Sequence, residues 1–177
     1  MPQGVEAPES ALAVNVPEAE PYVGRLRERF DPSAKLGMLA HITVLYPFIP
    51  PERITDSVVR KVRGILSAFA AFEFRLVRIA RFPTALYLAP EPAQPFIGLT
   101  EGVVRAFPEY PPYAGQYDSI VPHLMVAEAG EGADVAEAEL LAVLPARVGI
   151  EASCNEVVLI ENSSGRWKRM HSFRLAR

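Results

Sequence analysis

The sequence predicts an α+β fold of two similar halves, each with a sheet that is covered by helices on one face. Two apolar, β-branched runs, residues 38–48 and 119–127, each contain one histidine, and both have the pattern of a buried strand. Each run is followed about ten residues later by an amphipathic helix and then by further strands. The chain therefore divides into two similar halves, and sheets with helices on one face give an α+β architecture.

The first half begins with residues 1–10, which we expect to be a loose lead-in because they are polar and contain proline and glycine. Residues 11–16 predict a short strand. Over residues 18–30 apolar side chains recur at helical spacing, and the arginines occupy the opposite side of the helix. Residues 31–37 form a turn that leads into the first histidine strand.

The middle of the chain contains the clearest helical pattern, a single apolar stripe over residues 54–69. Residues 72–76 alternate as a half-buried strand. The alternation shifts by one position at Val77, which predicts a β-bulge. This strand forms a hairpin with residues 85–89, and a helix follows over residues 93–107.

The last third starts with residues 108–116, where prolines and a glycine predict an irregular loop before the second histidine strand. A Gly-Glu-Gly break then precedes the final elements. These are a helix over residues 134–144 and strands near 148–151, 156–161 and 166–175.

Composition bounds the class of protein. The 177 residues fit one bilobal domain over 1–177, and 50% hydrophobic residues exclude a disordered chain. A formal net charge of −3 argues against binding to duplex DNA, which requires a basic face. Cys154 is the only cysteine, so neither an internal disulfide nor a cysteine-based zinc site is possible. With no signal peptide and no long apolar span, we expect a soluble, cytoplasmic monomer without membrane contact.

The two histidine strands carry the main functional signal. Side chains alternate across a strand, so His41 and Thr43 share one face, while His123 and Met125 share the corresponding face of the second strand. Helices should cover the alternate, apolar face of each strand. Both histidines should therefore point into the space between the lobes.

A lone histidine in an apolar strand usually has a structural role, and we assign His171 in the last strand to that class. Two histidines at equivalent positions of two half-repeats instead favour function, because two imidazoles can serve together as acid and base near neutral pH. The hydroxyl of Thr43 lies about 7 Å along the strand from His41, a separation that suits one phosphate group touched by both side chains.

A His-x-Thr motif on a strand, followed half a domain later by a second histidine motif, resembles the 2H phosphoesterase superfamily, which includes 2′-5′ RNA ligase-like proteins and cyclic phosphodiesterases. The resemblance covers most of the chain, from the strand near Ala11 to the last strand. It implies two pseudo-symmetric lobes, each an antiparallel sheet with helices on its outer face, around a central cleft. It implies that His41 and His123 are the acid–base pair and that Thr43 holds a phosphate oxygen, with no metal and no cofactor. The implied substrate is a nucleotide or short RNA end with a 2′,3′-cyclic phosphate or a 2′-linked phosphodiester. In the reverse direction, the same site would catalyse ligation.

The second motif departs from this pattern, because Met125 occupies the place of a threonine or serine and cannot donate a hydrogen bond. Either the enzyme is retuned, or the chain is a catalytically impaired protein that binds a nucleotide or RNA end. Ser119 could replace the missing hydroxyl, or Met125 could line an apolar part of the substrate pocket. Tyr113 and Tyr117, in the loop before His123, either stack on a nucleobase or cover the edge of the core.

Other chemistries fit poorly. The sequence contains no Gly-x-Ser-x-Gly elbow, no Walker-type phosphate loop and no His-Glu-x-x-His motif. Two histidines alone would leave a metal ion short of ligands.

Overall fold

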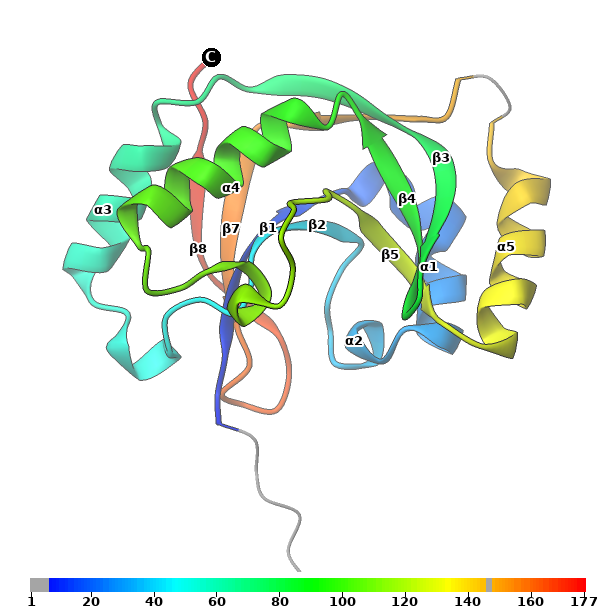
Figure 1. The fold of residues 1–177 in the computed structure, drawn as a ribbon, viewed down its shortest axis with the longest axis horizontal. Coiled ribbons are helices and arrows are strands. Elements are labelled where there is room, and N and C mark those ends of the chain that lie inside the picture. Colours follow the sequence, from blue (N-terminus) through cyan, green and yellow to red (C-terminus); the bar gives the residue numbers. More distant parts are fainter. Residues whose placement is uncertain (1–6, 146–147) are drawn as a thin grey trace, which may run out of the picture.

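Two four-stranded antiparallel sheets with helices packed against them form the protein. Figure 1 shows their arrangement in this computed structural model, which describes residues 7–145 and 148–177. Sheet 1 has the strand order β2-β1-β7-β8, and sheet 2 has the order β5-β4-β3-β6. The α+β prediction is therefore confirmed. The strands are β1 (Ser10–Asn15), β2 (His41–Leu45), β3 (Phe72–Phe82), β4 (Ala85–Glu91), β5 (Leu124–Glu128), β6 (Ile150–Cys154), β7 (Glu156–Glu161) and β8 (Lys168–Arg174).

The helices belong to two groups, one on each sheet (Figure 1). Helices α3 and α4 lie on sheet 1, where α4 packs against β2 and α3 against β8. Helices α1 and α5 lie on sheet 2, where both pack against β5. The helices are α1 (Glu20–Phe30), α2 (Pro32–Lys35), α3 (Asp56–Leu66), α4 (Gln94–Ala106) and α5 (Glu131–Val143), with short 3-10 turns η1 (Pro17–Ala19), η2 (Pro51–Arg53) and η3 (Pro112–Gly115).

The pseudo-symmetry appears as two strand–helix–strand units, β1-α1-β2 and β4-α4-β5. In each unit the two strands pair antiparallel and the second strand lies at the edge of its sheet. The helices are exchanged between the units, since α1 from the first unit covers sheet 2 and α4 from the second unit covers sheet 1. This exchange places β2 and β5 next to each other at the centre of the molecule (Figure 1).

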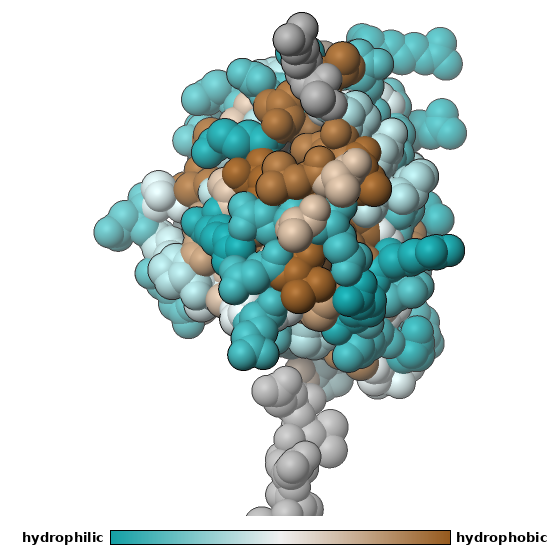
Figure 2. All heavy atoms as spheres, turned by 90° about the vertical axis from the view of Figure 1, so that its right-hand side faces the viewer, coloured by the Kyte–Doolittle hydropathy of each residue, from teal (hydrophilic) through white to brown (hydrophobic). Residues whose placement is uncertain are grey.

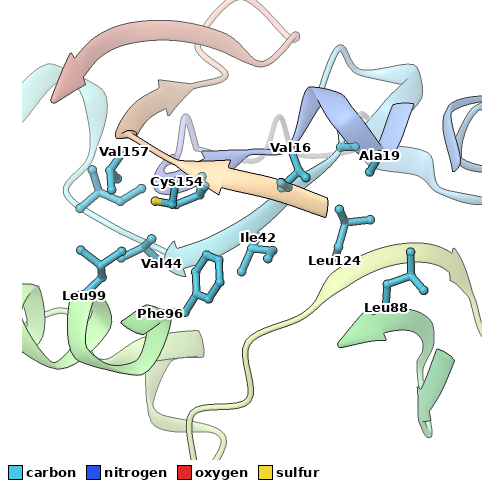
Figure 3. Close-up of a cluster of buried hydrophobic side chains, with 14 of the residues drawn as sticks. Val16, Ala19, Ile42, Val44, Leu88, Phe96, Leu99, Leu124, Cys154 and Val157 are labelled. Carbon is cyan, nitrogen blue, oxygen red and sulfur yellow. The ribbon is translucent and has the colours of Figure 1, made fainter. Parts of the chain in front are cut away.

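A continuous hydrophobic core runs from one lobe into the other. Ile42 and Val44 of β2 are buried and face Phe96 and Leu99 of α4 (Figure 3). Leu124 of β5 is equally buried, which confirms that helices cover the apolar face of both histidine strands. A hydrogen bond also joins α4 to β2, because the buried hydroxyl of Thr100 on α4 donates to the carbonyl oxygen of Val44 at 2.7 Å.

The bulge predicted at Val77 is present, since the register between β3 and β4 shifts between Leu76 and Arg78. The predicted hairpin of these two strands is also confirmed.

Several boundaries differ from the sequence prediction. Ser10 is not part of a loose lead-in but begins β1, fully buried, with its hydroxyl donating to the carbonyl of Ile49 at 2.6 Å. Residues 1–6 of the lead-in lie outside the described residues. The turn at 31–37 contains the short helix α2, and α5 begins three residues earlier than predicted. The second histidine strand begins only at Leu124, because Pro122 lacks the N–H that a strand ladder needs.

The side of the molecule that carries α5 combines apolar and polar surface (Figure 2). Exposed apolar side chains on and just after this helix are Val135, Leu141, Val143 and Val148. Among the described residues no helix is both long and apolar enough to span a membrane.

Candidate active site

His41 and His123, 82 positions apart in sequence, lie where the two adjacent edge strands β2 and β5 begin. His41 is the first residue of β2, and His123 immediately precedes β5. The two rings are close enough for the charge of His123 to influence the pKa of His41. The fold therefore brings the two residues together.

Both imidazoles are oriented by the same local hydrogen bond. Nδ1 of His41 lies 2.7 Å from the carbonyl oxygen of Leu39, and Nδ1 of His123 lies 2.7 Å from that of Val121. A carbonyl oxygen only accepts, so Nδ1 must carry the proton in both rings. This fixes the tautomer and leaves Nε2 as the nitrogen that can exchange a proton with a ligand. Each bond reaches back two residues, so the repeated geometry extends the pseudo-symmetry from the backbone to the side chains.

Both histidines favour the neutral state. Burial, assisted by the positive charge of Arg27, lowers the pKa of His41 from 6.5 to about 4. Burial also lowers the pKa of His123. At neutral pH both rings are therefore uncharged in the free protein. A bound anion would raise both pKa values, because an opposite charge favours the protonated form.

Arg27 of α1 is buried, although the helical pattern of the sequence predicted that it would face solvent. It was expected on the solvent side of its helix, yet it is only 2% exposed. Its Nε and Nη2 donate to one carboxylate oxygen of Asp31 at 3.0 and 2.8 Å, and its Nη1 donates to the carbonyl of Met38 at 3.0 Å. A buried charge requires such partners. The i,i+4 spacing of Arg27 and Asp31 was the signal in the sequence that could have indicated this ion pair. The pair fixes the segment that leads into His41.

Thr43 lies two residues after His41 on β2 and shares its face of the strand. Its side chain lies close enough to the phenol of Tyr113 to influence the pKa of that group, and both residues line the same pocket. The Tyr113 ring lies nearly parallel to that of His123, with ring centroids 6.5 Å apart and planes inclined by 26°. Tyr113 thus connects the first histidine motif to the second.

The loop that carries Tyr113 has an unusual backbone. It contains η3, where regular structure was not predicted, and Tyr113 and Ala114 adopt left-handed conformations with φ of 50° and 53°. The N–H of Tyr113 donates to the carbonyl of Tyr46 at 2.6 Å, which fixes this loop to the end of β2.

A pocket of about 220 Å³ lies beside Thr43, between β2, α4 and the loop at 112–122. It brings together four of the residues singled out from the sequence, which are Thr43, Tyr113, Tyr117 and Ser119. The carboxylates of Glu101 and Asp118 also belong to its lining. Neither His41, His123 nor Met125 lines this pocket, so it adjoins the histidine pair rather than containing it.

Met125 lies on β5, opposite Tyr87 of β4, and is partly buried. The ring of His123 packs edge-on against Phe82 and Tyr87, with centroids 5.0 and 5.5 Å away. His171 lies on β8, opposite Leu159, and its ring is 6.3 Å from that of Phe173. Among residues 7–145 and 148–177, no three His, Cys, Asp or Glu side chains gather so that they could hold a metal ion.

Comparison with known proteins yields one family and several similar structures. The model of the 2′-5′ RNA ligase superfamily matches residues 15–166. No curated protein sequence matches the chain. E. coli LigT complexed with 3′-AMP is 14% identical, with a TM-score of 0.63 over 97% of this chain and 100% of LigT. The protein TT0787 of Thermus thermophilus is 18% identical, with a TM-score of 0.62 over 94% of this chain and 97% of its own. E. coli LigT complexed with NADP+ is similarly related, at 14% identity and a TM-score of 0.59 over 97% of this chain and 99% of LigT.

Proposed function

The chain belongs to the 2′-5′ RNA ligase superfamily, and on this premise we propose that it is a metal-independent phosphodiesterase. Its substrate is a 2′,3′-cyclic phosphate or a 2′-linked phosphodiester of a nucleotide or short RNA end. The observation that carries this proposal is the matched pair of Nδ1 hydrogen bonds on His41 and His123, at 2.7 Å in both. These bonds fix the tautomer of two imidazoles at the starts of neighbouring edge strands. In each ring Nε2 is left to exchange a proton with the substrate.

In the proposed reaction, Nε2 of the neutral histidine accepts a proton from water as the water oxygen attacks phosphorus. The bond from phosphorus to the ribose oxygen breaks, and the protonated histidine donates its proton to that oxygen. Thr43 donates to a phosphoryl oxygen and stabilises the charge that develops there. Water is consumed and one phosphomonoester with a free hydroxyl is formed. For a 2′-linked phosphodiester, the reverse reaction joins the phosphomonoester to the free hydroxyl with release of water, so the same groups would then catalyse ligation.

Electrostatics supports a particular division of roles. Arg27 disfavours a positive charge on His41, which keeps that ring neutral and suited to act as the base. The pKa of His123 is lowered by burial, without a contribution from such a cation. His123 is therefore the easier of the two to protonate beside a phosphate, and we assign it as the acid.

The pocket beside Thr43 supports a nucleotide as the substrate. Its volume of about 220 Å³ and its two tyrosine rings suit a nucleobase, since a base can stack on an aromatic face. E. coli LigT, which shares the fold, is known in complex with 3′-AMP and NADP+. The direct test is turnover of nucleoside 2′,3′-cyclic phosphates by the purified chain in EDTA. We expect turnover to survive the chelator, and its absence from all four nucleosides would overturn the proposal.

The proposed roles predict an acidic pH optimum for kcat/KM. The base must be neutral, so kcat/KM rises as the pH rises through about 4, the pKa of His41. The acid must be protonated, so kcat/KM falls as the pH rises through the pKa of His123, which lies below 6.5. The maximum is expected between these limits and is measured with substrate well below KM. An optimum at alkaline pH would contradict the role of these two groups.

Met125 favours a second candidate, a protein that binds a nucleotide or RNA end without cleaving it, because the second motif lacks a phosphate-binding hydroxyl. Calorimetry with 3′-AMP in parallel with the turnover assay separates the two. Binding accompanied by hydrolysis of cyclic substrates supports the enzyme, whereas binding alone supports this alternative.

A further inference from the structure

We propose that Tyr113 supplies the phosphate-binding hydroxyl that position 125 lacks, so that the site holds phosphate with Thr43 from one lobe and a tyrosine from the connecting loop. This inference rests on the proposed function. The two histidine motifs have the same spacing but differ in the residue two positions after each histidine. Thr43 follows His41 by two residues, and Met125 follows His123 by two residues, yet Met125 has no hydrogen to donate.

The contacts of Tyr113 place its phenol beside both motifs. It lines one pocket together with Thr43, close enough for Thr43 to influence the pKa of the phenol, and its ring lies alongside His123 with centroids 6.5 Å apart. A phosphate that accepts a hydrogen bond from Thr43 therefore comes within reach of the phenol as well. When such an anion binds, each of the two hydroxyls donates one hydrogen bond to a phosphoryl oxygen.

The position of this phenol is strongly constrained. The Tyr113 N–H is held by the Tyr46 carbonyl at 2.6 Å, and its ring packs edge-on against Tyr46 and Tyr117, with centroids 6.4 and 5.6 Å away. Tyr113 itself has a φ of 50°, which is uncommon for a bulky residue. Such strain persists where the surroundings over-determine it, and it gathers at functional sites.

The phenol is also in the protonation state that a phosphate requires. Burial raises the pKa of Tyr113 above its ordinary value of 10.0, although Thr43 acts in the opposite direction. The hydroxyl therefore keeps its proton at neutral pH and can donate it in a hydrogen bond to an anion.

The variant Tyr113→Phe tests this role, because it removes the hydroxyl and keeps the ring. We expect kcat/KM for a nucleoside 2′,3′-cyclic phosphate to fall about 10- to 100-fold, the usual loss of one hydrogen bond to a charged group. The matched control is Tyr110→Phe, the same change in the same loop. The Tyr110 ring packs on Phe48, 5.8 Å away, so the control should stay within about two-fold of the wild type.

Replacement of Met125 distinguishes a phosphate contact from a merely structural role. Tyr113→Phe combined with Met125→Thr should regain most of the lost kcat/KM, because a hydroxyl returns to the site, whereas Met125→Thr alone should change little. A Tyr113→Phe variant with wild-type activity would overturn the proposal. So would a large gain from Met125→Thr alone, since the wild-type site would then lack its second hydroxyl.

Binding of 3′-AMP keeps this test separate from that of the proposed function. If the wild type does not turn over cyclic phosphates, the proposed function fails, but the affinity for 3′-AMP still reports on Tyr113. A roughly 10-fold or greater loss of affinity in Tyr113→Phe, with Tyr110→Phe unchanged, would support Tyr113 as a phosphate ligand. Equal affinities in all three proteins would rule it out.

Discussion

Replacing either His41 or His123 with alanine is expected to lower kcat for cyclic phosphate hydrolysis at least about 100-fold, the usual contribution of a general acid or base. Both rings are needed in one transition state, because one accepts the proton of water while the other protonates the departing oxygen. The double variant should consequently be little worse than either single variant, as expected for groups that act as a unit. Steady-state and single-turnover rates in EDTA give the measurement.

The matched control is His171→Ala, which removes an imidazole of the same kind from β8, opposite Leu159 and outside the histidine pair. It should retain kcat within about two-fold. Wild-type turnover in His41→Ala and His123→Ala would show that hydrolysis takes place without this pair. Circular dichroism and thermal unfolding establish that the alanine variants are folded.

Replacing Asp31 with alanine is expected to lower the free energy of unfolding by about 3–5 kcal/mol, because it leaves the guanidinium of Arg27 buried without its counter-charge. The two side chains are 2% and 1% exposed, so water cannot take the place of the carboxylate. For a chain of this length the loss corresponds to a fall in Tm of about 10 °C. Urea unfolding and calorimetry measure both quantities.

An exposed ion pair provides the comparison. Asp134 lies 2.9 Å from Arg81 but is 74% exposed, so Asp134→Ala should cost less than about 1 kcal/mol. Equal effects of Asp31→Ala and Asp134→Ala would contradict a buried role for the first pair. Activity should fall together with stability in Asp31→Ala, since Arg27 also holds the carbonyl of Met38 in the segment that leads into His41.

The elements that the sequence predicted best are those with strong periodicity. Alternation along residues 72–76 predicted the strand, and the change of parity at Val77 predicted the bulge, because a one-residue shift moves every later side chain to the other face. The parity of Ile42 and Val44 against His41 likewise indicated which face of β2 is buried. Such patterns are local, and one sequence contains them in full.

What the sequence missed depends on contacts between distant segments. No local pattern shows that α1 packs on the sheet of the other half, and it is this exchange that sets β2 beside β5. Arg27 was misplaced because a charged residue in an amphipathic pattern usually faces solvent, and its partner in the Met38 backbone is not visible in side-chain spacing. The contact of Tyr113 with Thr43 joins residues 70 positions apart and depends on left-handed backbone at Tyr113 and Ala114, residue types that rarely adopt it.

The central claim is that His41 and His123 act on one phosphorus atom, and a crystal structure of the chain with 3′-AMP tests it most directly. We expect a phosphate group with oxygens about 2.6–3.2 Å from Nε2 of both histidines, and with Thr43 Oγ1 at a similar distance from a third oxygen. A phosphate that contacts only one of the two rings, or that binds away from β2 and β5, would contradict it.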